Sequence, residues 1–129
     1  MTRFLTALFF ATATFLPAAA QPDIMYDIGW EDPQDHYFDV TMEIGGLSEP
    51  TVEVRMPAWR PGRYIIQNYV RYVIEFAAST PDGERLPFEK VDKDTWRVAT
   101  LGNERIVVSY RNYANVLDGG ESFLGESEA

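Results

Sequence analysis

The sequence predicts an all-β protein, an antiparallel β-sandwich of about seven short strands with one short helical turn. Short runs of residues alternate between apolar and polar side chains with a period of two, as half-buried strands do. Turn-forming residues separate these runs at intervals of about 8–12 residues. Residues 64–70 alone look helical, whereas an α/β fold needs helices of about 10–15 residues between its strands. A closed barrel is the alternative to the sandwich.

The first three strands are expected in the N-terminal half of the domain. Residues 24–30 predict a strand at a sheet edge. Residues 36–44 alternate strictly, and two glycines at 45–46 end the run. Residues 51–56 alternate in the same way until Pro57 stops the strand, because proline has no N–H to donate to a ladder.

The remaining strands follow the same logic. Residues 72–78 predict a strand that ends at the Pro-Asp-Gly turn of residues 81–83, where proline presets φ and glycine accepts a positive φ. We expect residues 86–91 to pair with that strand as a hairpin. Residues 96–99 predict a further short strand, and residues 106–111 predict the last one.

The first twenty residues have the layout of a secretory signal peptide. A cationic start at residues 1–3 precedes an apolar run over 4–16, Pro17 breaks the run, and three alanines at 18–20 offer a cleavage site. The run is too short to span a bilayer of about 30 Å as a helix. We therefore expect an exported protein, periplasmic or secreted, with no membrane attachment after cleavage.

Length and composition indicate one domain. The chain has 129 residues, of which 46% are hydrophobic, so it is neither disordered nor large enough for two domains. We expect the β-domain to occupy residues 21–114. Residues 115–129 are expected to form a polar tail, with the chain truncated before a catalytic domain.

Charge and residue types exclude several function classes. A net charge of −9 would repel nucleic acid, so we expect no nucleic-acid partner. The chain has no cysteine and a single histidine, which leaves no thiolate nucleophile and no site that needs two histidines. Serines occur, but without a second histidine or a G-x-S-x-G elbow they do not predict a hydrolase. We therefore assign no catalytic and no metal-binding residue.

Two sets of titratable residues could suggest a metal site. His36 opens a strand in which Asp35 and Asp39 fall on the opposite face, so a packed or solvated ring is expected. Asp92 and Asp94 share a face, but calcium needs about 6–8 oxygen ligands and no D-x-D-x-D-G run follows. A charged turn is the expected reading of the second pair.

Residues 56–66 interrupt the alternation and hold the candidate site. The segment crowds prolines, a glycine, a tryptophan and arginines together, and exposing a tryptophan forgoes about 1.5–3 kcal/mol of burial. One interpretation is a structural corner that plugs the end of the sandwich. The other is an interdomain or ligand surface formed by Trp59, Arg60, Pro61, Gly62 and Tyr64.

Five motifs occur in an order that resembles a known family. They are D-H-Y-F at 35–38, M-P-A-W-R-P-G-R-Y at 56–64, R-Y-V at 71–73, E-K-V-D-K-D-T-W-R-V at 89–98 and V-S-Y-R-N-Y-A at 108–114. The series resembles the N-terminal domain of the glycyl aminopeptidase family of zinc metallopeptidases, which are thermolysin-like gluzincins. The resemblance extends over about residues 24–125.

The resemblance implies a noncatalytic β-domain that packs on a catalytic domain and shapes its substrate cleft. It implies zinc in that other domain, held by an H-E-x-x-H motif and a downstream glutamate, none of which occurs here. We therefore expect no cofactor and no activity in this chain alone, and self-association through an exposed apolar face. The alternative is a free-standing secreted module that binds peptide or carbohydrate on exposed aromatic residues. Its candidate residues are Tyr64, Tyr69, Tyr72, Tyr110 and Tyr113.

Overall fold

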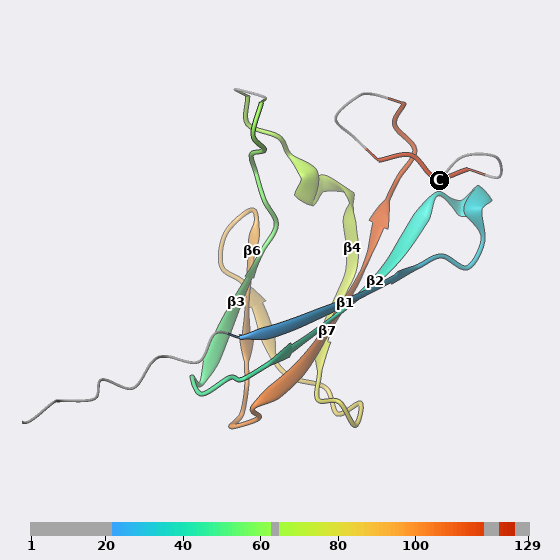
Figure 1. Cartoon of the computed structure of the whole chain (residues 1–129). Helices are drawn as coiled ribbons and strands as arrows, with labels where there is room; N and C mark the ends of the chain where they lie inside the picture. The colour runs from blue at the N-terminus through green and yellow to red at the C-terminus, as the bar shows by residue number, and fades with distance from the viewer. Residues whose placement is uncertain (1–21, 63–64, 118–121, 126–129) are drawn as a thin grey trace, which may run out of the picture.

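The computed structural model describes residues 22–62, 65–117 and 122–125, and these form two antiparallel β-sheets (Figure 1). The four-stranded sheet has the order β1-β2-β7-β4 and the three-stranded sheet the order β3-β6-β5. The predicted all-β sandwich is confirmed. The strands are β1 (Asp23–Gly29), β2 (Tyr37–Gly45), β3 (Thr51–Arg55), β4 (Val73–Ser79), β5 (Phe88–Lys90), β6 (Thr95–Ala99) and β7 (Arg105–Tyr113), with 3-10 turns η1 (Pro33–Asp35) and η2 (Tyr69–Tyr72).

The core lies between the two sheets and is built by the predicted alternation. In β2, Val40, Met42 and Ile44 are buried, because every second side chain of a strand points to the same face. Their neighbours on β7 include Ile106 and Val108, which are fully buried. The facing sheet contributes mainly Trp96 and Val98 of β6, its central strand.

The predicted hairpin between residues 72–78 and 86–91 forms only beside its turn, where Leu86 N–H donates to the Ala78 carbonyl at 2.9 Å. The turn itself forms, since Thr80 N–H donates to the Glu84 carbonyl at 2.8 Å and Ser79 faces Arg85 in an isolated bridge. Pairing then stops at Pro87, which has no N–H. The Pro87 carbonyl accepts instead from Ala99 N–H at 2.9 Å, so the chain crosses to the other sheet and β5 pairs with β6.

The predicted helical turn over residues 64–70 is misplaced. The structure has a 3-10 turn at Tyr69–Tyr72 instead, and residues 65–68 are not helical. Ile65 and Ile66 are both exposed, so these residues bury no apolar face that would favour a helix over the extended path. Neither 3-10 turn, nor any other helix in the part of the chain that the structure describes, could cross a membrane.

The predicted domain organisation also assigned roles to the two ends of the chain, residues 1–20 and 115–129. The predicted signal peptide, residues 1–20, lies outside the described residues. Within 115–129, the segment expected as a polar tail, Leu124 is 0% exposed, and its N–H donates to the Ala114 carbonyl at 2.8 Å. Asn115 faces Phe123 in an isolated bridge. Leu124 therefore packs on the sandwich although it lies beyond Ala114.

Candidate functional site

The candidate segment after β3 forms a loop at one end of the sandwich, the upper end in Figure 1. Backbone hydrogen bonds hold its base: Met56 N–H donates to the Asp94 carbonyl at 2.9 Å, and Gln67 N–H donates to the Ala58 carbonyl at 2.8 Å. Gly62 has a φ of 88°, the positive value that the Pro-Gly pair predicts for a turn. The loop is thus anchored at its base and turned by Gly62.

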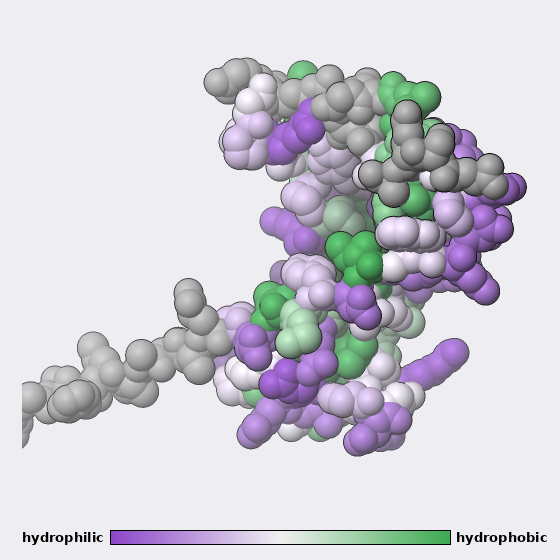
Figure 2. Space-filling model, turned by 45° about the vertical axis from the view of Figure 1, so that its right-hand side comes forward, coloured by the Kyte–Doolittle hydropathy of each residue, from purple (hydrophilic) through white to green (hydrophobic). Residues whose placement is uncertain are grey.

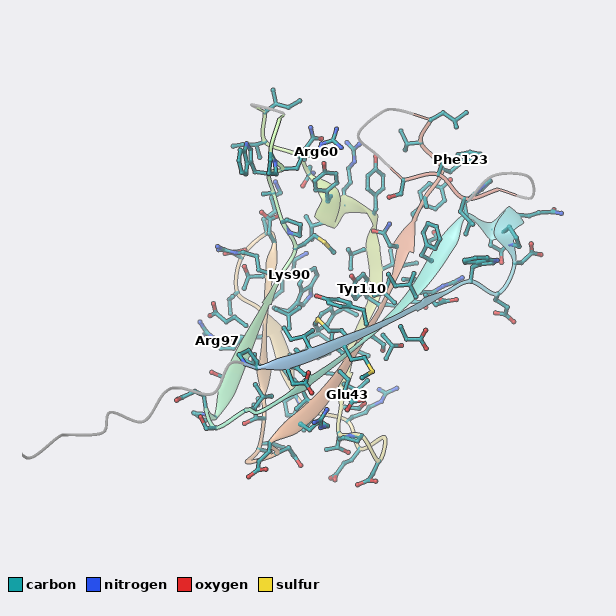
Figure 3. The ribbon with its side chains drawn as sticks, viewed as in Figure 1. Glu43, Arg60, Lys90, Arg97, Tyr110 and Phe123 are labelled. Carbon is teal, nitrogen blue, oxygen red and sulfur yellow. The ribbon has the colours of Figure 1, made fainter. Side chains whose placement is uncertain are left out.

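The loop exposes its tryptophan. The Trp59 side chain is 54% exposed, and Pro61 and Gly62 are exposed beside it in the sequence. Arg60 is half-buried and lies at the upper end with them (Figure 3). Tyr64, the fifth predicted site residue, lies outside the described residues. The structure therefore places four of the five predicted residues in one loop, with about half of the Trp59 side chain exposed.

The same end carries apolar residues that the sequence reasoning did not select. Ile66 is 81% exposed, Ile65 beside it is exposed, and Leu117, which follows β7, is 79% exposed. The described parts of segments 56–66 and 114–125 both project at this end (Figures 1 and 2), and we call them the loop end. The signal in the sequence was an isoleucine pair next to a Pro-Gly turn. Because this pair does not belong to an alternating strand pattern, the sequence gives no sign that its side chains are buried in a sheet.

An unpaired polar atom lies in the segment that closes the loop. Gln67 is buried, yet its Nε2 amide has no hydrogen-bond partner among the residues that the structure describes. Leaving a buried donor unpaired costs about 1–3 kcal/mol, because the group loses its water without replacement. The unpaired amide of Gln67, next to the loop end, therefore lowers the stability of the folded domain.

His36 is a structural residue that joins the start of β2 to the C-terminal segment. It adopts a left-handed conformation with φ 59° and ψ 33° at the end of η1. Its Nδ1 lies 2.5 Å from the Leu124 carbonyl oxygen, and because a carbonyl only accepts, Nδ1 carries the hydrogen and donates. Its ring also contacts those of Tyr113 and Phe123. The expectation of a packed ring is confirmed.

The predicted charged turn around Asp92 is confirmed. Asp92 Oδ1 accepts from the Asp94 N–H at 2.8 Å, and Oδ2 accepts from Arg55 at 3.3 Å. The hydrogen bond from Asp94 N–H lowers the pKa of the Asp92 carboxyl below its ordinary value. Among the described residues, no group of three or more histidine, aspartate or glutamate side chains is placed to hold a metal ion.

A small apolar cavity of about 90 Å³ lies between the sheets. Tyr26, Met42 and Tyr110 line it from the four-stranded sheet, with Phe76 and Trp96 stacked at 4.6 Å between ring centroids. Tyr110 points toward the space between the sheets (Figure 3), and burial, with a smaller effect from Tyr26, raises the pKa of its phenol. The lining is mainly apolar, and Arg55 also contributes to it.

The aromatic residues proposed for a free-standing binding module do not form one platform. Tyr110 lines the cavity, Tyr113 packs against Tyr37 at 5.1 Å between ring centroids, and Tyr72 lies against the Arg71 guanidinium at 4.5 Å. Tyr64 lies outside the described residues. Among the described residues, Tyr72, Tyr110 and Tyr113 therefore lie in different surroundings, and Tyr69 is half-buried in η2.

Comparisons with known proteins identify relatives of this fold. A model of the peptidase M61 N-terminal domain family matches residues 25–129. The crystal structure of an aminopeptidase N family protein from Idiomarina loihiensis is similar, with a TM-score of 0.71 and 30% identity. The similarity covers 80% of this chain and 17% of that one, so the chain spans about a sixth of that protein's length. No curated protein matches the chain.

Proposed function

The chain belongs to the peptidase M61 N-terminal domain family, and on that basis we propose that it is the noncatalytic N-terminal β-domain of an exported, glycyl aminopeptidase-like zinc metallopeptidase. In this proposal it packs on a thermolysin-like catalytic domain and helps to shape the substrate cleft. Zinc and the groups that activate water would belong to that domain. The aminopeptidase name of the Idiomarina loihiensis protein supports the activity class of the parent enzyme.

The observation that carries the proposal is the exposed apolar surface of the loop end. Trp59, Ile65, Ile66 and Leu117 are all large and exposed there. Full burial of such a side chain from full exposure is worth about 1.5–3 kcal/mol, and covering the exposed part of each recovers a share of it. Interfaces between domains of one chain bury about 600–1,500 Å². Anchored backbone around an exposed tryptophan is typical of a preformed docking surface.

The first test is the genomic reading frame beyond the codon for Ala129. We expect it to encode an H-E-x-x-H motif with a downstream glutamate. An immediate stop codon, with no such motif downstream in any frame, would contradict the proposal. Binding of a peptide or carbohydrate by the isolated chain would then support the alternative of a secreted binding module.

The second test places substitutions in the longer protein. Trp59→Ser and Ile66→Ser should each loosen the loop end from the catalytic domain. We expect a several-fold higher KM for glycyl substrates and faster cleavage between the domains in limited proteolysis. Leu101→Ser is the matched control, because Leu101 is 68% exposed but belongs to the turn between β6 and β7. Equal effects of all three substitutions would refute docking at the loop end.

The isolated chain supplies the complementary assay. Purified chain should release no N-terminal residue from peptides, whether or not zinc is added. Release that a chelator abolishes, with contaminating peptidases excluded, would show that this domain has catalytic chemistry of its own and would overturn the proposal.

A further inference from the structure

The free edge of β1 is the least protected strand edge of the described fold. β1 pairs with β2 over all seven residues, from Asp23 opposite Gly45 to Gly29 opposite Asp39, without a register shift (Figure 1). It ends the sheet, so one row of its N–H and C=O groups has no strand partner. Proteins usually blunt such an edge with lysine, proline or a bulge, because it can pair with another chain. β1 contains no lysine and no proline, and no bulge interrupts its pairing with β2; its charged residues are Asp23 and Asp27.

The opposite edge of the same sheet is protected in that way. β4 carries a β-bulge between Ile74 and Ala77, and Glu75 within it has a φ of 54°. A bulge breaks the regular spacing of hydrogen-bonding groups and twists the edge. The edges of the smaller sheet, β3 and β5, are only five and three residues long. Among the described strands, β1 is therefore the edge suited to accept another strand.

The side chains of β1 add exposed apolar surface to this edge. Ile24, Tyr26 and Ile28 share a face, since they lie opposite Ile44, Met42 and Val40 of β2, yet the smaller sheet leaves all three exposed. Tyr26 is 57% exposed and Met25, on the other face, is 65% exposed. A partner strand would cover an apolar row and complete a hydrogen-bonded ladder at the same time.

We propose that two copies of this chain associate through β1, pairing antiparallel edge to edge about a two-fold axis at Tyr26. The two four-stranded sheets would then form one continuous sheet across the dimer. An isologous contact uses the same patch on both copies, so the patch must be complementary to itself. In this register Ile24 lies opposite the partner's Ile28, and Tyr26 lies opposite the same residue of the second copy. The apolar rows therefore meet.

The aspartates of β1 disfavour the two registers on either side of this one, and axes at Ile24 or Ile28 would pair fewer residues of the seven-residue strand. A two-fold axis that relates two antiparallel strands passes through one residue position in each, because opposed residues must share a face. An axis at Met25 would place Asp23 opposite Asp27 of the second copy, and an axis at Asp27 would oppose the two Asp27 carboxylates. Like charges directly opposite destabilise a sheet. With the axis at Tyr26, Asp23 lies opposite Gly29 and Asp27 lies opposite Met25.

The contact should be weak and concentration-dependent. One seven-residue strand on each side supplies about six to eight backbone hydrogen bonds. The area is at or below the roughly 1,200 Å² that separates transient from stable complexes. Diagonal approach of the two Asp27 carboxylates adds a repulsion that salt screens. The proposal concerns β1 alone and does not depend on the proposed peptidase function, which uses the loop end.

Analytical ultracentrifugation of the 129-residue chain over a wide concentration range tests the proposal. We expect a monomer–dimer equilibrium that shifts toward the dimer as salt is raised. The same chain beginning at Gln21 should behave alike, which excludes the apolar N-terminal run as the cause. A chain that stays monomeric at every concentration and salt, or one that associates only with residues 1–20 present, would overturn the proposal.

Two substitutions at Met25 test the register itself. In the proposed dimer, residue 25 of each copy lies opposite Asp27 of the other copy. Met25→Lys therefore creates two lysine–aspartate pairs, and Met25→Glu creates two glutamate–aspartate pairs of like charge. We expect dimerisation about 2- to 30-fold tighter for the lysine and weaker by a similar factor for the glutamate. Salt should weaken the first dimer and strengthen the second. Equal dissociation constants for the two variants would show that another surface associates.

Controls separate this effect from folding and from the loop end. Met25 also lies opposite Glu43 of β2, so thermal unfolding of both variants at a dilution where each is monomeric records any change in the monomer. Ile66→Ser at the loop end and Leu101→Glu in the turn before β7 should leave the dissociation constant unchanged. If Ile66→Ser abolishes association while the Met25 variants do not alter it, the dimer forms through the loop end and the proposal fails.

Discussion

Leu124→Ala tests how strongly the C-terminal segment stabilises the domain. Leu124 is 0% exposed, and its backbone links two elements: its N–H donates to the Ala114 carbonyl at 2.8 Å, and its carbonyl accepts from His36 Nδ1 at 2.5 Å. Replacing a buried leucine by alanine costs about 2–5 kcal/mol, the lost burial plus the cavity left behind. For a domain of this size the melting temperature should fall by about 10–25 °C.

The same segment supplies a matched control for that substitution. Leu117 is the same residue type, lies seven positions earlier in the sequence and is 79% exposed, so Leu117→Ala should change stability by less than about 0.5 kcal/mol. Urea denaturation followed by circular dichroism gives both free energies of unfolding. Equal losses for the two variants, or a loss below about 1 kcal/mol at Leu124, would refute the conclusion that Leu124 packs on the sandwich.

Three further predictions concern single residues. Gln67→Met removes the unpaired buried amide and should raise the free energy of unfolding by about 1 kcal/mol in urea titrations; a loss would show that the amide has a partner. Leu101 has a φ of 50°, so Leu101→Gly should stabilise the turn by about 1 kcal/mol, measured as a higher melting temperature; an unchanged or lower value would mean that the left-handed backbone costs little there. Burial raises the pKa of the Tyr110 phenol above its ordinary value of 10.0, so the unfolded chain loses that proton at a lower pH than the folded chain does. Stability that is present below pH 10 is therefore lost as pH rises toward the folded-state pKa. In unfolding curves from pH 8 to 11, Tyr110→Phe should lose less stability than the parent chain, and identical pH profiles would argue against this cause.

The alternating strands could be predicted because their pattern is local. Whether Val40, Met42 and Ile44 share a face follows from the two-residue period of a strand, whichever strands lie beside it. The Pro-Gly turn of the loop end was predictable for the same reason, since the positive φ at Gly62 depends on the residue itself. The exposed Trp59 could be singled out from composition, but its exposure could not.

The misplaced elements depend on long-range choices. The turn before Arg85 forms as expected, yet the pairing beyond it depends on which strand donates to the Pro87 carbonyl, and that strand is β6, which comes later in the chain. Within residues 64–70, Val70 is buried but Ile65 and Ile66 are exposed, so the described residues there form no continuous apolar face that would favour a helix. Which segment pairs with a strand or covers an apolar face depends on how the sheets assemble. A short stretch of sequence does not include that partner.

The amino-acid sequence by itself determined the all-β class, the alternating core faces, the turns and the absence of cysteine and of a second histidine. It also contained the ordered motifs from which the peptidase family resemblance was drawn. The tertiary structure decided which strands share a sheet, that His36 is tied to Leu124, and that β1 is an unblocked edge. The physical reason is that side-chain direction and turn geometry depend on neighbouring residues, whereas pairing and burial depend on segments brought together only after the chain folds.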